Sequence, residues 1–88
     1  MEAFQSELDG PPLFEPGTKV EATRTVRNDG TYPNVPRGAF LIQAGDVGYV
    51  KSVGTYLNRY YIYAIDFVDR AMLVGMRGNE LTSLETPP

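Results

Sequence analysis

The sequence predicts an all-β domain, and three observations lead to that prediction. Residues 46–53 and 60–68 are rich in Val, Ile, Tyr and Phe, which suit the pleated surface of a strand. No apolar spacing of three and four residues continues for long enough to indicate a helix. The chain has 88 residues, which is enough for one domain with a small core. Because a two-stranded ribbon is only marginally stable alone, the flanking segments are expected to add further strands.

The chain before this ribbon divides into an arm and the start of the folded domain. Residues 1–15 carry several acidic residues and show little periodicity, so we expect an irregular arm with Leu13 or Phe14 resting on the domain. A Pro-Gly turn follows the arm. We therefore expect the folded domain to occupy residues 16–85 and a short tail to occupy residues 86–88.

A first strand and a long loop are expected next. Residues 18–26 alternate apolar and polar side chains, which indicates a half-buried strand with Arg24 as the one break in its inner face. Residues 27–45 are interrupted by prolines and glycines, and a loop of this length in a small domain is either functional or poorly ordered. Within this loop, the apolar residues 40–42 either form a short strand or tuck under the sheet as a plug.

The C-terminal part completes the predicted fold. Residues 72–77 form a further strand, residues 78–81 suit a single helical turn, and Leu84 closes a short last strand. This order is typical of a small five-stranded, partly open SH3-like barrel, with a long loop after strand 1 and one short helical turn before the last strand. An OB-like barrel is the structural alternative, which the chain length and the lack of a longer helix disfavour. The residues expected to fill the barrel are Val20, Val47, Val50, Val53, Ile65, Phe67, Val74, Leu81 and Leu84, with Tyr61 and Tyr63 on the same face as Ile65 and Phe67.

Composition disfavours several classes of function. The chain contains neither cysteine nor histidine, so it lacks the usual ligands of transition metals and the commonest general base. We therefore expect no cofactor, no bound metal and no enzymatic activity. The N-terminus is acidic, and no apolar run resembles a signal peptide or reaches membrane-spanning length, so we expect a cytoplasmic protein with no membrane contact.

Two short motifs suggest chemistry, and each has a simpler structural explanation. The glycine-rich residues 45–48 resemble a phosphate-binding loop, but they open a strand and no Lys-Ser/Thr pair follows them. Asp66 and Asp69 are close enough in sequence to suggest a carboxylate pair. Paired acid–base chemistry requires a cleft that separates two pKa values, and a barrel of this size has little room for one. We expect a strand-entry turn and solvated carboxylates.

Arginine and tyrosine form the most informative set of side chains. Both residue types are enriched in protein interfaces, and both also stack on single-stranded nucleic acid. A purely structural role for these residues stays equally open. The net charge of −3 and the two lysines disfavour nucleic acid, so we expect no nucleic-acid partner. The set consists of Arg24, Arg27, Arg59, Tyr32, Tyr56, Tyr60 and Tyr61.

Several runs of residues together resemble the NifZ family of nitrogen-fixation accessory proteins. The most specific are RNDGTYP at residues 27–33 and GTYL at residues 54–57, preceded by a PGxKV run and accompanied by GDVGYV. The resemblance covers about residues 16–84. It implies a chaperone-like role in P-cluster maturation, with the immature nitrogenase molybdenum–iron protein, and other nitrogenase assembly factors, as partners. Relatives often carry cysteine where this chain has Met76, so a thiol role is not implied here.

The resemblance and the residue types together predict a non-catalytic binding module. A chain without thiol or imidazole groups is expected to assist iron–sulfur assembly by binding the client polypeptide. Two segments, at residues 24–33 and 54–61, are expected to lie next to each other and to make the contacts. The alternative is an accessory subunit of an electron-transport complex, resembling the small SH3-like peripheral subunit of photosystem I or the variable chain of ferredoxin:thioredoxin reductase. The predicted partner-binding residues are Arg24, Arg27, Asn28, Asp29, Tyr32, Pro33, Tyr56, Leu57, Arg59 and Tyr60.

Overall fold

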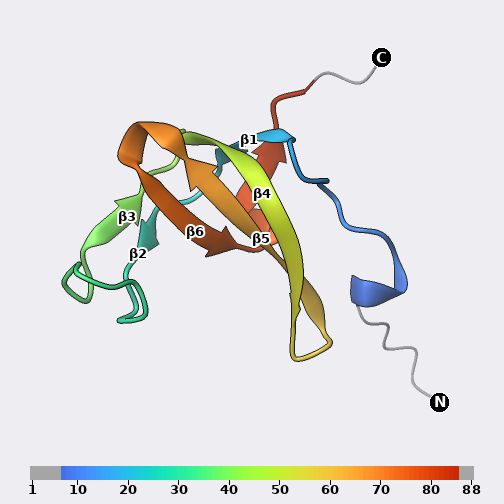
Figure 1. Ribbon diagram of the computed structural model, residues 1–88, viewed down its shortest axis with the longest axis horizontal. Coiled ribbons are helices and arrows are strands. Elements are labelled where there is room, and N and C mark those ends of the chain that lie inside the picture. Colours follow the sequence, from blue (N-terminus) through green and yellow to red (C-terminus); the bar gives the residue numbers. More distant parts are fainter. Residues whose placement is uncertain (1–6, 86–88) are drawn as a thin grey trace.

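The computed structural model describes residues 7–85, and this part of the chain is built from strands and single helical turns (Figure 1). The all-β prediction is confirmed. The strands are β1 (Lys19–Ala22), β2 (Val26–Arg27), β3 (Phe40–Ile42), β4 (Val47–Tyr56), β5 (Tyr60–Phe67), β6 (Met72–Met76) and β7 (Leu81–Ser83). The 3₁₀ turns are η1 (Glu7–Asp9), η2 (Val68–Arg70) and η3 (Gly78–Glu80).

The strands form one five-stranded sheet and one two-stranded sheet, which do not close on each other. The order in the larger sheet is β6-β5-β4-β1-β7, with antiparallel pairing throughout. The smaller sheet pairs β2 with β3 inside the long connection between β1 and β4. The single helical turn before the last strand is η3. The predicted partly open arrangement of five strands is therefore confirmed.

The first strand is shorter than predicted. The chain bends at Thr23 and Arg24, so residues 18–26 divide between β1 and β2, which belong to different sheets. Arg24 lies exposed at this bend, at the position where the apolar alternation is interrupted. The apolar residues 40–42 form a strand rather than a plug. The connection between β4 and β5 has three residues, fewer than residues 54–59 that separate the two strand-forming runs of the sequence, because both strands continue to the tip of the hairpin.

The core lies on one face of the larger sheet, and a β-bulge decides which valines reach it. Val50 pairs with Ile65, and the register then shifts by one residue at Lys51. A bulge of this kind lets Val50 and Val53, three residues apart, point to the same side. No bulge separates Val47 from Val50, so Val47 points outward and is 37% exposed. The prediction that Val47 belongs to the core is therefore wrong.

Most of the other predicted core residues are confirmed. Burial alternates along β5, so that Tyr63, Ile65 and Phe67 face inward. Leu84 is the second error, because it follows β7, is 40% exposed and contributes its backbone N–H to the Lys19 carbonyl. The buried apolar residues are Phe14, Val20, Ala22, Leu41, Ile42, Val50, Tyr63, Ile65, Phe67, Val74, Met76 and Leu81.

The described part of the N-terminal arm rests on β5. Phe14 is buried and meets the Tyr63 ring edge-on, with 5.3 Å between the ring centroids. The Leu13 backbone N–H donates to the Tyr63 hydroxyl at 2.8 Å, while the Leu13 side chain stays largely exposed. The Tyr61 hydroxyl donates to the Gly10 carbonyl at 2.7 Å. The expected contact between arm and domain is therefore confirmed for residues 7–15, and residues 1–6 lie outside the described part.

Candidate protein-binding site

The tip of the β4–β5 hairpin is built around two residues with left-handed backbone conformation. Leu57 has φ 52° and Asn58 has φ 53°, and the Arg59 N–H donates to the Tyr56 carbonyl at 2.9 Å. Positive φ at both central residues characterises the type I′ turn, which usually contains Asn or Gly. Asn58 is suited to this conformation, but Leu57 is not, and its side chain is 71% exposed. The fold therefore holds a leucine in an unfavourable conformation at a protruding tip.

Two tyrosines lie directly behind this tip on the outer face of the hairpin. The rings of Tyr56 and Tyr60 stack across the strands with their centroids 5.4 Å apart. Arg77, just beyond β6, places its guanidinium carbon 3.7 Å from the centroid of the Tyr60 ring. The same guanidinium lies 3.5 Å from the Glu7 carboxylate of the arm. Leu57, Tyr56, Tyr60 and Arg77 form one continuous feature, which we call the hairpin patch.

The opposite face of the hairpin is used for structure. Tyr61 and Tyr63 lie on this face and hold the arm through the two hydrogen bonds described above. Burial raises the pKa of the Tyr63 hydroxyl, because the charged phenolate would lose water there. Tyr61 is therefore occupied by a contact within the chain, whereas Tyr60 faces the outer side.

Asn28 organises the loop that follows β2. The side chain is only 2% exposed, and its amide nitrogen donates to the carbonyls of Tyr32 at 3.1 Å and Val35 at 2.7 Å. The amide oxygen accepts from the N–H groups of Gly30 at 3.0 Å and Tyr32 at 3.1 Å. Asn28 was predicted to contact a partner, but its side chain is buried and fully used within the loop. Its contribution is to fix the conformation of the residues around it.

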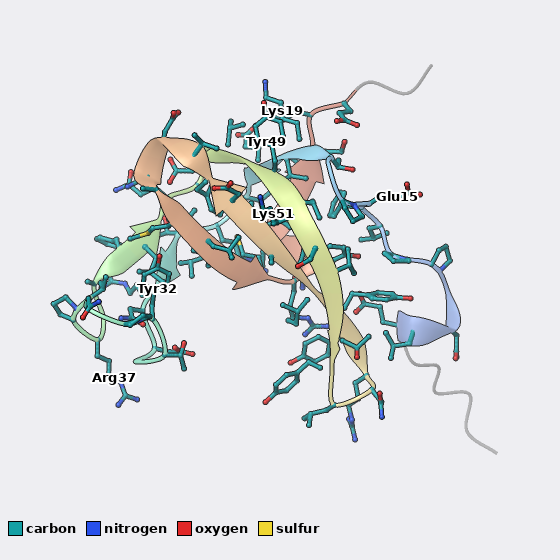
Figure 2. The ribbon with its side chains drawn as sticks, viewed as in Figure 1. Glu15, Lys19, Tyr32, Arg37, Tyr49 and Lys51 are labelled. Carbon is teal, nitrogen blue, oxygen red and sulfur yellow. The ribbon has the colours of Figure 1, made fainter. Side chains whose placement is uncertain are left out.

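The other predicted residues of this loop are more accessible. The Arg27 guanidinium lies 4.2 Å from the centroid of the Phe40 ring and donates to the Gly38 carbonyl at 3.1 Å. Asp29 accepts from both the backbone and the hydroxyl of Thr31, and these hydrogen bonds lower the pKa of its carboxyl group. Arg24 and Pro33 are exposed, and Tyr32 is half-buried against the core. Arg37 extends from the loop away from the body of the domain (Figure 2).

The structure does not place the two predicted segments next to each other. The β2–β3 loop and the β4–β5 hairpin project from different parts of the domain, with β6 between them (Figure 1). Their separation follows from the sheet topology, because β2 and β3 pair only with each other and form a separate small sheet. The predicted site residues therefore form two surfaces, and the loop surface contains Arg24, Arg27, Asp29, Tyr32 and Pro33.

Arg77 is a site residue that the sequence reasoning missed, although a signal was present. It follows Met72, Val74 and Met76, whose alternation places them on the inner side. By the same alternation Arg77 belongs to the outer face, beside β5. A Tyr on the outer face of β5 and an Arg on the outer side of the next strand are candidates for a cation–π pair.

The described residues contain neither a cluster of metal ligands nor a helix that could span a membrane. Among residues 7–85, no group of three or more acidic side chains is placed to hold a metal ion. The helical turns in the same part of the chain are too short to cross a membrane.

Fold and surface together define a small, open all-β domain with a protruding aromatic hairpin. Comparison with known proteins then identifies the family. The model of the NifZ domain matches residues 11–83, and the chain belongs to the NifZ family. It is therefore associated with nitrogen fixation, as the resemblance of residues 27–33 and 54–57 implied.

Curated relatives extend over most of the chain. A relative from Sinorhizobium fredii that carries the NifZ name is 51% identical over 78 residues, covering 89% of this chain and 72% of its own length. Protein NifZ of Azotobacter vinelandii is 46% identical over 76 residues, which are 86% of this chain and 48% of that protein. Protein NifZ of Klebsiella pneumoniae is 34% identical, again over 86% of this chain and 51% of that protein. No solved structure matches the chain.

Proposed function

We propose that this protein is a non-catalytic chaperone of the cytoplasm, which binds the immature nitrogenase molybdenum–iron protein and assists maturation of its P-clusters. Membership of the NifZ family supports the nitrogen-fixation context. The absence of cysteine and histidine from the sequence supports action through binding, since the chain has none of the usual ligands of an iron–sulfur cluster. Other nitrogenase assembly factors are potential members of the same complex.

The conformation of Leu57 is the observation that carries this proposal. A left-handed conformation costs a residue with a side chain about 1–2 kcal/mol. Strain of this kind persists where the surrounding structure enforces it, and it is concentrated at functional sites. Here the strained residue is also 71% exposed, so its side chain contributes little to the core. A partner that buries Leu57 would explain why this side chain stands at the tip.

The hairpin patch has the chemistry of a protein interface. Leu57 supplies an apolar end, the stacked rings of Tyr56 and Tyr60 supply a rigid base, and Arg77 adds a planar cation. Tyr and Arg are the residue types that most often dominate binding energy in interfaces. A module that binds one conformation of the client more tightly than the others raises the population of that conformation. The bound state would then be the one in which the clusters mature.

Capture of the immature molybdenum–iron protein by the purified chain tests the proposal. We expect Tyr56→Ala to weaken binding about tenfold or more, as is typical of a central aromatic contact. Tyr49→Ala is a matched control, because Tyr49 lies on the same strand, at the end far from the tip, and is exposed to a similar extent (44% against 50%). Equal binding by both variants would exclude the hairpin patch. Failure of the unaltered protein to capture the client would exclude the proposed function itself.

A further inference from the structure

Arg77 is the member of the hairpin patch that lies outside the hairpin. Its guanidinium carbon is 3.7 Å from the centroid of the Tyr60 ring, and its Nη2 atom is 3.5 Å from Oε1 of Glu7. Within residues 7–85, Glu7 is the only acidic side chain that pairs with this guanidinium. The N-terminal arm therefore reaches the outer face of the sheet at this point and touches the patch.

The arm is anchored to the domain independently of Glu7. Two tyrosine hydroxyls of β5 hydrogen-bond the backbone of residues 10–13, and Phe14 is buried in the core. The Gly10 N–H donates to the Glu7 carbonyl at 3.3 Å, which joins the η1 turn to this anchor. The arm runs beside the hairpin as a result (Figure 1). Glu7 is thus brought to Arg77 on a short turn whose far end is fixed.

The backbone around Arg77 is held by η3 and by the arm. The Arg77 N–H donates to the Glu80 carboxylate at 2.9 Å. The next residue, Gly78, is buried, and a Cβ atom there would lie 2.8 Å from Cδ1 of Leu13, so the arm passes directly over it. The freedom that remains to Arg77 is therefore in its long side chain.

Two partners restrict that side chain. It is 45% exposed, and an arginine has many rotamers, whose loss on binding costs free energy. Tyr60 attracts the guanidinium to the face of its ring, and Glu7 attracts the same group from the side of the arm. A guanidinium that is already held in place when a partner arrives avoids part of the entropic cost of binding.

We infer that Glu7 is a positioning residue of the client-binding site, which holds Arg77 over the Tyr60 ring in the conformation that the client contacts. This inference rests on the proposed function, because the client is the partner that the hairpin patch binds. The Glu7 side chain is 32% exposed, so the ion pair is weak and adjusts the affinity without determining it. The arm and the hairpin, which are far apart in the sequence, act as one site.

NMR of the Arg77 side chain tests the positioning without any client. A guanidinium that lies over an aromatic ring is shielded by the ring current, so the Nε–H and δ-methylene protons of Arg77 should resonate upfield of ordinary arginine values. We expect Glu7→Gln to move these signals back towards ordinary values. Asp9→Asn is the matched control, because it removes the same charge from the same turn, and Asp9 belongs to no ion pair within residues 7–85. Unchanged Arg77 signals in Glu7→Gln would overturn the inference.

The affinity for the immature client tests the consequence. We expect Glu7→Gln to weaken binding about two- to fivefold, within the range that partly exposed ion pairs contribute, and Asp9→Asn to leave it unchanged. In an Arg77→Gln background, Glu7→Gln should have no further effect, because Glu7 acts through Arg77. An equal loss in both backgrounds would show that Glu7 touches the client directly. Tighter binding by Glu7→Gln would show that Glu7 competes with the client for Arg77, and either result would overturn the inference.

The two measurements separate this inference from the proposed function. Displaced Arg77 signals in Glu7→Gln together with unchanged client affinity would refute the inference and leave the proposed function standing. Failure of the unaltered protein to capture the client would refute the proposed function, whatever the Arg77 signals show. Urea unfolding provides the control for the fold, and we expect Glu7→Gln and Asp9→Asn to unfold at similar urea concentrations, since the anchor of the arm is intact in both.

Discussion

Replacing Leu57 by glycine separates the stability of the fold from the binding of the client. Glycine adopts the left-handed region without strain, so the substitution recovers about 1–2 kcal/mol. The greater freedom of glycine in the unfolded chain costs about 0.5–1 kcal/mol. Loss of the buried fraction of a side chain that is 71% exposed costs a further ~0.5 kcal/mol. These contributions nearly cancel, so the free energy of unfolding should stay within about 1 kcal/mol of the original value.

Binding should behave differently, because the leucine side chain would fill a pocket on the partner. We expect Leu57→Gly to weaken capture of the immature client about tenfold, the loss that is common for a central apolar contact. Urea unfolding, monitored by tyrosine fluorescence, measures the stability of each variant. Surface plasmon resonance with the immature client immobilised measures its affinity. Leu57→Ala is the control, because it removes the same contact but keeps the strain, so it should bind as weakly and unfold slightly more easily. Unchanged affinity of Leu57→Gly, or a stability loss well above about 1 kcal/mol, would refute the reasoning.

Three further predictions concern the framework that carries the two surfaces. Asn28→Ala should lower the free energy of unfolding by about 2–4 kcal/mol in urea titrations, because it leaves several groups of the loop without partners. A loss below about 1 kcal/mol would contradict this. Gly48→Ala should destabilise measurably in the same assay, since a Cβ atom there would lie 2.6 Å from the Ile65 side chain. The Arg70 guanidinium hydrogen-bonds the Asp46 carboxylate and lowers the pKa of that carboxyl group. The stabilisation of the fold by this interaction is present above the ordinary Asp pKa of about 3.9 and is lost as the pH falls through the lower pKa of the folded state. Asp46→Asn should therefore flatten the acid limb of a curve of stability against pH.

The positions of most strands along the chain could be predicted, because they depend on local patterns. Alternation along β5 placed Tyr63, Ile65 and Phe67 inside, and the structure confirms that face. The errors arose where one residue changes the period. A bulge at Lys51 reverses the alternation in β4, so that Val47 and Val53 lie on opposite faces. The sequence pattern gives no sign of this bulge, and Val47 was therefore assigned to the wrong face. Register shifts therefore limit what periodicity alone predicts.

The candidate site was predicted in part, because residue type does not reveal where a polar side chain points. Asn28 belongs to a run typical of tight turns, but its burial depends on four carbonyl and amide groups that converge on it only after the loop has folded. The strain at Leu57 was equally hidden. The sequence around it suggests a connection of several residues, and the positive φ of Leu57 and Asn58 becomes visible only once Tyr56 is paired with Tyr60.

The hairpin patch suggests how the proposed binding module would distinguish an immature client from a mature one. The hairpin patch presents side chains that are already ordered, since Tyr56 stacks on Tyr60 and Arg77 lies over the same ring. An incompletely assembled client exposes apolar segments that can cover this patch, whereas a mature client has buried them in its own core. Affinity would thus fall as the client matures, and release would require no energy source beyond the folding of the client itself.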